Sequence, residues 1–195
     1  MARVGFKKAK INEIDATTKK YKVSGLKLFE KVVDEKFAPE YNNAELYAND
    51  SLAESDNTFI RGTLTLTIAD DDDTLLSEIF GNTIDDGEVT QNINDTAPEY
   101  GYGHIIPKVV NGARKYKVEF FPRIKFTKVT SDNKTRGASV EFSTTSVEAT
   151  VYPLGEAING VAIDTWEKHQ TFDTLAEAET YLDGLLTPPS GNGTV

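Results

Sequence analysis

Hydrophobic and polar residues alternate along several segments of this chain, which is the pattern of half-buried β-strands. In residues 59–69, Ile60, Leu64, Leu66 and Ile68 share one parity, and the opposite parity is rich in threonine. Both residue types are enriched in strands. We therefore predict a strand here, with one buried face and one threonine-rich outer face.

A second alternating pattern runs from about residue 115 to residue 152 and predicts one long β-hairpin. Pro122 interrupts its first half. Because proline cannot donate a ladder hydrogen bond, this strand should lie at a sheet edge or be bulged there. Turn-forming residues follow in SDNKTRG, and a change of parity near Thr144–Ser146 predicts a bulge in the returning strand. The first half shows one apolar parity, made of Tyr116, Val118, Phe120, Ile124 and Phe126.

Other segments complete a mainly β prediction. Two short runs in residues 19–33, separated by Gly25, read as strands. Residues 36–57 form a polar stretch of more than twenty residues, which we interpret as a loop with a functional or contact role. Residues 82–103 form a second polar connection that ends in an aromatic and glycine run.

The segment DDDDTLLSEIFG predicts a helix over about residues 71–80. Asp70 or Asp71 is expected at the N-cap, with the other aspartates in the first turn, where the helix dipole favours negative charge. Gly81 then supplies the left-handed residue that ends a helix. Four side chains are expected to form the apolar face that packs on the sheet: Leu75, Leu76, Ile79 and Phe80.

The same four carboxylates also suggest a metal site, but their spacing argues against it. A calcium loop places its ligands at alternate positions around a turn glycine, whereas Asp70, Asp71, Asp72 and Asp73 are adjacent. On a helix, consecutive residues point about 100° apart, so four in a row do not converge on one ion. We predict a helix cap and no bound metal.

A second helix is predicted over about residues 174–186. Thr174 and Glu177 have the spacing of a capping box, and apolar residues follow at helical spacing. The predicted organisation is therefore a β domain over residues 1–152, a C-terminal extension over 153–187 to which the sequence assigns no role, and a disordered tail over 188–195.

Composition limits the class of protein. The chain has 195 residues and no cysteine, which fits one globular domain folded in a reducing cytoplasm and excludes disulfides and cysteine-ligated zinc. The sequence contains no run of eighteen apolar residues and no apolar signal segment, so we predict neither a membrane span nor secretion.

The net charge is −10 and it alternates in blocks along the chain. Residues 1–36 and 100–136 are basic, whereas residues 37–99 and 137–195 are acidic. Such blocks would let copies pair head to tail, although plain solvated surface charge explains them equally well. The overall acidity argues against a nucleic-acid binder.

Catalysis finds no support in the sequence. His104 and His169 are about sixty-five residues apart, and the chain contains none of the common nucleophile, zinc-protease or phosphate-loop motifs. We expect His104 to line a turn or a subunit surface. The prediction is a protein that is not an enzyme and has no cofactor.

Five segments in a fixed order resemble the major tail protein family of long-tailed, non-contractile bacteriophages of Gram-positive hosts. They are AELYANDSLAESD, FIRGTLTLTIADDDDTLLSEIFG, APEYGYG, NGARKYKVEFFPRIKF and TRGASVEFSTTSVEATVY. The similarity spans about residues 20–152. Residues 153–195 depart from the family pattern.

This resemblance implies a tail-tube β-sandwich or barrel with one flanking helix. It implies that six subunits form a ring, that rings stack into a tube around the tape-measure protein, and that phage DNA passes through the channel without specific binding. Tail terminator and distal tail proteins are the further partners implied. The location implied is the virion, after assembly in the host cytoplasm.

By position, the resemblance places the hairpin 115–152 at the channel, and the stretch 36–57 together with the N-terminal arm at ring-to-ring contacts. Because bare basic groups would bind DNA phosphates, we hypothesise that five basic side chains pair with acidic residues of a neighbouring subunit. They are Lys115, Lys117, Arg123, Lys125 and Lys128. The alternative from a different class is an acidic β-sandwich that binds a carbohydrate or a receptor and is stabilised by calcium.

Overall fold

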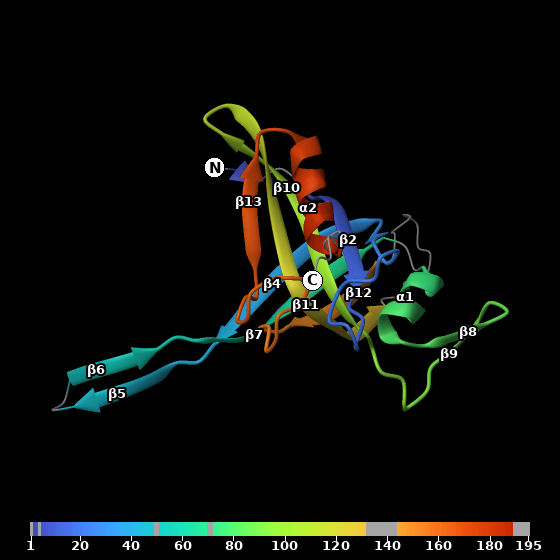
Figure 1. Cartoon of the computed structure of the whole chain (residues 1–195), viewed down its shortest axis with the longest axis horizontal. Helices are drawn as coiled ribbons and strands as arrows, with labels where there is room; N and C mark the ends of the chain where they lie inside the picture. The colour runs from blue at the N-terminus through green and yellow to red at the C-terminus, as the bar shows by residue number, and fades with distance from the viewer. Residues whose placement is uncertain (1, 4, 49–50, 70–71, 132–143, 189–195) are drawn as a thin grey trace, which may run out of the picture.

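The computed structural model describes residues 2–3, 5–48, 51–69, 72–131 and 144–188, and the fold is mainly β, as the alternation predicts. Its centre is a nine-stranded sheet of order β3-β2-β10-β11-β12-β7-β4, with β1 paired to β10 and β13 paired to β11 (Figure 1). The main strands are β2 (Lys7–Glu13), β4 (Val32–Tyr41), β7 (Phe59–Ile68), β10 (Glu99–Val110), β11 (Ala113–Ser131) and β12 (Thr145–Val151). The shorter strands of the sheet are β1 (Ala2–Arg3), β3 (Lys27–Leu28) and β13 (Lys168–Phe172).

Strand β11 organises the sheet because it pairs with three other strands, all antiparallel. One edge pairs with β10. The other edge pairs first with β13, along Tyr116–Phe120, and then with β12, along Ile124–Ser131. The β11–β12 pairing is the hairpin predicted over residues 115–152. Its connection at 132–143 lies outside the described residues, and so does the strand expected just before Thr144.

A β-bulge at Pro122 changes which face of β11 is buried against which core. The register with β10 shifts between Tyr100 and Tyr102, so that Pro122 and Arg123 lie opposite a single residue, Gly101. Before the bulge, the even-numbered apolar residues face one core, and after it they face the other. The bulge is one of the two alternatives predicted at Pro122, and it is the reason that the single apolar parity of this strand is divided between two cores.

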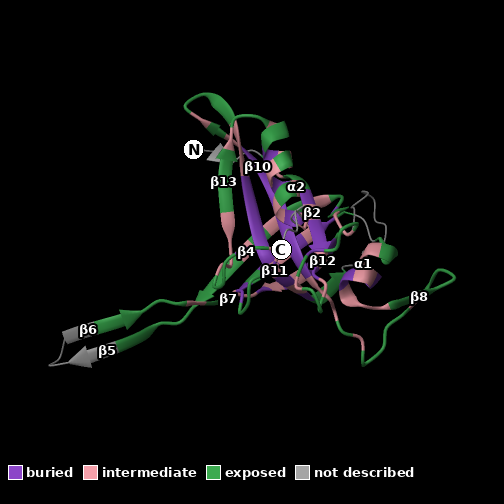
Figure 2. Cartoon of the chain, viewed as in Figure 1, coloured by how far each residue is buried: buried purple, intermediate pink, exposed green. Residues whose placement is uncertain are grey.

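The sheet curls so that β4, at one end, comes to face β10 and β11. The ring of Phe37 on β4 lies 4.8 Å from that of Phe121 on β11. Between the two halves lies the larger core, which includes Leu64 and Leu66 of β7. The alternation places Ile60 on the same inner face, but Ile60 is 46% exposed, so that part of the prediction is wrong. Figure 2 shows the buried residues concentrated along the middle of the sheet.

A second core lies on the opposite face, under helix α2 (Leu175–Leu186). Ala178, Leu182 and Leu186 of α2 are fully buried there against Ile105 and Val118. Thr174 and Glu177 form the predicted capping box. Residues 153–187 therefore complete the main sheet through β13 and one core through α2, and do not form a separate extension.

Helix α1 (Asp73–Phe80) packs on the larger core, whereas α2 packs on the second one. Neither α1 nor α2, the helices of the described residues, has the length and apolar character needed to cross a bilayer. Residues 189–195 of the predicted tail lie outside the described residues.

The two polar stretches were predicted to be loops. The structure shows that each contains a β-hairpin. Residues 36–57 hold the end of β4 and then the hairpin β5 (Ala44–Ala48) and β6 (Ser51–Asp56). This hairpin, which we call the arm, extends away from the sheet (Figure 1). Residues 82–103 hold a second hairpin, β8 (Thr83–Asp85) and β9 (Glu88–Thr90), and the start of β10.

Candidate functional site

The aspartate run caps helix α1, but through a residue further along than predicted. The Asp72 side chain accepts hydrogen bonds from the backbone N–H groups of Thr74 (3.0 Å) and Leu75 (3.2 Å). Asp72 is thus the N-cap, and Asp73 lies in the first turn. Asp70 and Asp71, the residues expected at the cap, lie outside the described residues.

The apolar face of α1 packs on the larger core. Ile79 is fully buried, and Leu75, Leu76 and Phe80 are half-buried against the same cluster. Gly81 ends the helix with φ 73°, the left-handed conformation that favours glycine. A side chain at Gly81 would also meet the backbone oxygen of Thr96 at 2.5 Å.

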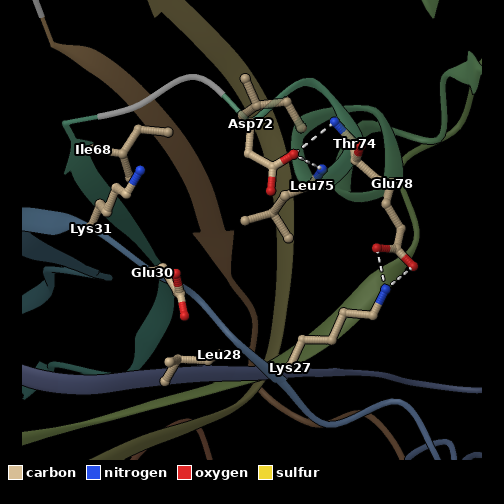
Figure 3. Close-up of a pocket in the computed structure, with 10 residues that line it drawn as sticks. Lys27, Leu28, Glu30, Lys31, Ile68, Asp72, Thr74, Leu75 and Glu78 are labelled. Carbon is tan, nitrogen blue, oxygen red and sulfur yellow. Dashed lines mark hydrogen bonds and ion pairs between the residues drawn. The ribbon is translucent and has the colours of Figure 1, made fainter. Parts of the chain in front are cut away.

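A cavity of about 270 Å³ lies beside α1 (Figure 3). Three of its polar side chains have partners within the chain. Lys27 pairs with Glu78, and Asp72 is engaged by the helix backbone. This region is therefore structural.

Replacing Asp72 by alanine should lower the free energy of unfolding by about 1 kcal/mol, because two N–H groups of the first turn lose their acceptor. Urea unfolding followed by circular dichroism measures the change. Asp73→Ala is the matched control and should cost only a few tenths of a kcal/mol, since Asp73 acts only through the helix dipole. Equal effects of the two substitutions would contradict the assigned cap.

Four of the five basic residues proposed for subunit contacts have acidic partners within the chain. The pairs are Lys115 with Asp173, Lys117 with Glu119 (2.5 Å), Arg123 with Glu99 (2.6 Å) and Lys128 with Glu148 (3.9 Å). The antiparallel register creates some of these pairs directly, because Lys128 lies opposite Glu148. Among the described residues, no carboxylate pairs with Lys125. These internal pairs weaken the hypothesis of contacts to a neighbouring subunit.

A cluster of buried polar side chains surrounds His104. This residue lies in the middle of β10 and is 1% exposed, so the prediction that it lines a turn or a subunit surface is wrong. Its Nδ1 atom lies 3.1 Å from Oε2 of Glu35, on β4, and its Nε2 atom lies 3.5 Å from Oε2 of Glu119, on β11. Phe6 stacks on the imidazole, with ring centroids 4.9 Å apart.

Two further side chains hold the carboxylates of this group. The Tyr102 hydroxyl donates a hydrogen bond to Oε2 of Glu35 at 2.6 Å. The Lys117 ammonium donates one to Oε1 of Glu119 at 2.5 Å. We call Glu35, Tyr102, His104, Lys117 and Glu119 the histidine cluster.

The environment shifts the pKa values of two members of the cluster. Burial alone would raise the pKa of Glu119, but hydrogen bonds and electrostatic attraction involving His104 and Lys117 outweigh it and lower the pKa to about 2. Burial raises the pKa of Tyr102 well above its usual value, and the charge of Glu35 raises it further. Tyr102 therefore stays protonated and donates its hydroxyl hydrogen to the Glu35 carboxyl group.

The histidine cluster borders a cavity of about 580 Å³. The register places His104 opposite Glu119, and Glu119 opposite His169 on β13, so both histidines of the chain line this one cavity. No serine or threonine occurs among the described lining residues, whereas carboxylates and imidazoles are concentrated there. This set of groups favours binding of a cation over nucleophilic chemistry.

The sequence carries a partial signal for the cluster. Tyr100, Tyr102, His104 and Ile106 share one parity, which is a strand pattern within a stretch that we predicted to be partly loop. No local sequence pattern predicts that Glu35 lies beside His104, because this contact depends on the curl of the sheet. In the comparisons with known proteins, no protein-family model and no curated protein matches this chain.

Proposed function

We propose that this protein is a structural subunit of a bacteriophage tail tube, which self-assembles into stacked hexameric rings. The observation that carries the proposal is the arm, residues 44–56. Its two strands pair only with each other among the described residues and project from the sheet (Figure 1). A two-stranded hairpin alone is at best marginally stable in water, so an arm of this kind needs a surface to pack on.

The exposed ends of the arm are polar and acidic. Glu45, Glu54 and Asp56 are exposed, and the arm as a whole belongs to the acidic block 37–99. In the basic block 100–136, Lys125 pairs with no carboxylate among the described residues, so it offers a second copy of the chain a charge of opposite sign. An arm of one subunit that packs on the body of the next supports the ring-to-ring contact implied by the sequence resemblance.

Strand addition at the sheet edge is a less favourable contact. The edge strand β4 is ten residues long, but it carries Pro39 and the charged residues Glu35, Lys36 and Glu40. Proline and charge at an edge are the usual features that limit pairing with another chain. We therefore assign the main assembly contact to the arm.

The net charge of −10 suits a tube through which DNA passes. Each Lys or Arg that contacts a phosphate releases counterions and adds affinity, which would hold the duplex in place. In the proposed tube the tape-measure protein occupies the channel during assembly, and tail terminator and distal tail proteins end it. The alternative of a calcium-stabilised ligand-binding module gains no specific support, because Asp72 acts as a helix cap.

Electron microscopy of the purified, concentrated protein tests the proposal. We expect hollow tubes or six-fold rings. A variant in which residues 44–56 are replaced by a short glycine and serine turn should remain folded and fail to assemble. Its melting midpoint should stay within a few degrees of that of the parent, because none of the arm side chains that the structure describes belongs to either core.

Two results would count against this assignment. A parent protein that stays monomeric at high concentration contradicts self-assembly. Tubes formed equally well without the arm contradict the contact that we assign to it. As a control, shortening the other projecting hairpin at Asp85–Glu88 tests whether any loss of assembly is specific to the arm.

A further inference from the structure

We propose that Glu35, His104 and Glu119 form a binding site for one divalent transition-metal ion, with Zn²⁺ as the representative ion. One ring nitrogen of His104 and one oxygen of each carboxylate lie within 4.8 Å of one another. Ligands about 2.1 Å from an ion are at most about 4.2 Å apart, so the three atoms need to close by well under 1 Å.

The imidazole of His104 is the independent observation that points to a ligand. It is 1% exposed, and its Nδ1 makes no hydrogen bond, although Oε2 of Glu35 is 3.1 Å away. A buried ring nitrogen that makes no hydrogen bond, with a carboxylate oxygen beside it, is the kind of unsatisfied polar atom that a bound cation stabilises. A metal ion between the two atoms would accept a coordinate bond from each of them.

The surrounding side chains have the arrangement that outer partners of metal ligands usually have. Tyr102 holds one oxygen of Glu35, and Lys117 holds Oε1 of Glu119, which leaves Oε2 of Glu119 directed toward the imidazole. Such hydrogen bonds fix the orientation of ligating carboxylates and favour their ionised form.

The ligand types indicate which ions fit. One imidazole and two carboxylates suit Zn²⁺, Mn²⁺ or Co²⁺, whereas Ca²⁺ and Mg²⁺ prefer oxygen ligands alone. The side chains of Glu35 and Glu119 are only 9% and 11% exposed, yet the site borders the cavity of about 580 Å³. The cavity gives an ion a way in and leaves coordination positions open to water.

A bound ion would join three strands that are distant in the sequence. Glu35 comes from β4, His104 from β10 and Glu119 from β11, so the ion would fasten the edge strand to the middle of the sheet. Strand β4 leads directly into the arm. Because the site depends on the folded chain alone, its test is independent of assembly and of the proposed function.

The experiment adds ZnCl₂ to the full chain, previously stripped with EDTA, at pH 7.5. Calorimetry should show one ion per chain. A free Zn²⁺ concentration of about 100 times the Kd should raise the melting midpoint by roughly 5–10 °C. Co²⁺ should give the visible absorption of an ion bound by nitrogen and oxygen in a site of low coordination number.

Three variants test whether the ion binds to these ligands. His104→Gln and Glu35→Gln should each lose the one-ion binding, the midpoint shift and the Co²⁺ spectrum. His169→Gln is the matched control, because His169 lines the same cavity, is 59% exposed and is not one of the three ligands. It should keep all three signals.

Several outcomes would overturn the proposal. If a proton on His104 already satisfies the cluster, Zn²⁺ will produce no shift in the parent protein. If the shift is the same in His104→Gln, the ion binds to surface carboxylates. If His104→Gln does not fold, the comparison rests on Glu35→Gln, whose substitution lies in an edge strand, and retention of binding there is equally decisive.

Discussion

Replacing Leu182 by alanine should lower the free energy of unfolding by about 3–5 kcal/mol. Leu182 is fully buried at the centre of α2, and its Cδ1 atom occupies the space above Gly103 of β10. Removing three carbon atoms there leaves a cavity that β10 and β11 are too constrained by their pairing to fill. Urea unfolding followed by circular dichroism and by the fluorescence of Trp166, the only tryptophan, measures the change.

The matched control is Leu185→Ala, the same substitution on the same helix. Leu185 is only half-buried, so its truncation should cost less than half as much. If both substitutions cost less than about 1 kcal/mol, α2 does not contribute to the core as described.

The contact between Leu182 and Gly103 allows a sharper test by a double-mutant cycle. A Cβ added at Gly103 would meet Leu182 Cδ1 at 2.4 Å, so Gly103→Ala alone should be destabilising. Combined with Leu182→Ala, the added methyl group enters the vacated space. The double variant should therefore be more stable than the sum of the single changes predicts, by about 1 kcal/mol or more.

Local sequence patterns predict where helix α2 lies but not what it packs against. Thr174 and Glu177 determine where α2 begins, and the predicted range 174–186 agrees with Leu175–Leu186. What the helix covers is determined elsewhere, because Gly103 provides room for it on a strand about eighty residues earlier. A capping box is local, whereas a packing partner is not. Because the packing partner of α2 leaves no local pattern, the sequence predicted residues 153–187 to be an extension apart from the β domain.

The same distinction explains the strands. Alternation in residues 59–69 predicts β7, which has one buried face and pairs regularly with β12. In β10, residues from Tyr100 to Ile106 are buried on both faces, so the pattern there is weak. In β11, the bulge at Pro122 exchanges the two faces. Proline predicts a bulge or an edge, but only the neighbouring strands decide between them.

The histidine cluster was beyond prediction for a related reason. Its three potential metal ligands are at positions 35, 104 and 119, and none lies in a recognisable motif. Two of them are brought together by the register of β10 and β11. The third arrives only because the sheet curls, and sheet curvature depends on twist and bulges summed over many strands.

Gly101→Ala should be as damaging as a large core truncation, with an expected loss of about 3 kcal/mol of unfolding free energy. A Cβ at position 101 would lie 2.6 Å from three atoms of the Tyr21 side chain, two ring carbons and the hydroxyl oxygen. Tyr21 has little freedom to move, since it is 2% exposed and its hydroxyl donates a hydrogen bond to the carbonyl oxygen of Pro122 at 2.8 Å. The expected loss combines overpacking with an unsatisfied buried carbonyl at the bulge.

The control is the same substitution at Gly184, where the opposite sign is expected. Gly184 lies in α2, is exposed, and a Cβ there would meet no atom within 4 Å. Gly184→Ala should stabilise the protein by about 0.5–1 kcal/mol, because alanine loses less backbone entropy in a helix. Opposite signs for two chemically identical changes exclude a general effect of the added methyl group.

Two further variants separate the two contributions to the destabilisation by Gly101→Ala, which are overpacking against Tyr21 and loss of the hydrogen bond to Pro122. Tyr21→Phe removes only the hydrogen bond to Pro122 and should cost about 1–2 kcal/mol. In a Tyr21→Leu background the ring is absent, so adding Gly101→Ala should cost less than about 1 kcal/mol. If the Gly101→Ala cost is unchanged in that background, its origin is not the tyrosine ring but the bulge backbone. Gly101 would then be required for the local conformation opposite Pro122 and Arg123, and not for the space that it leaves to Tyr21.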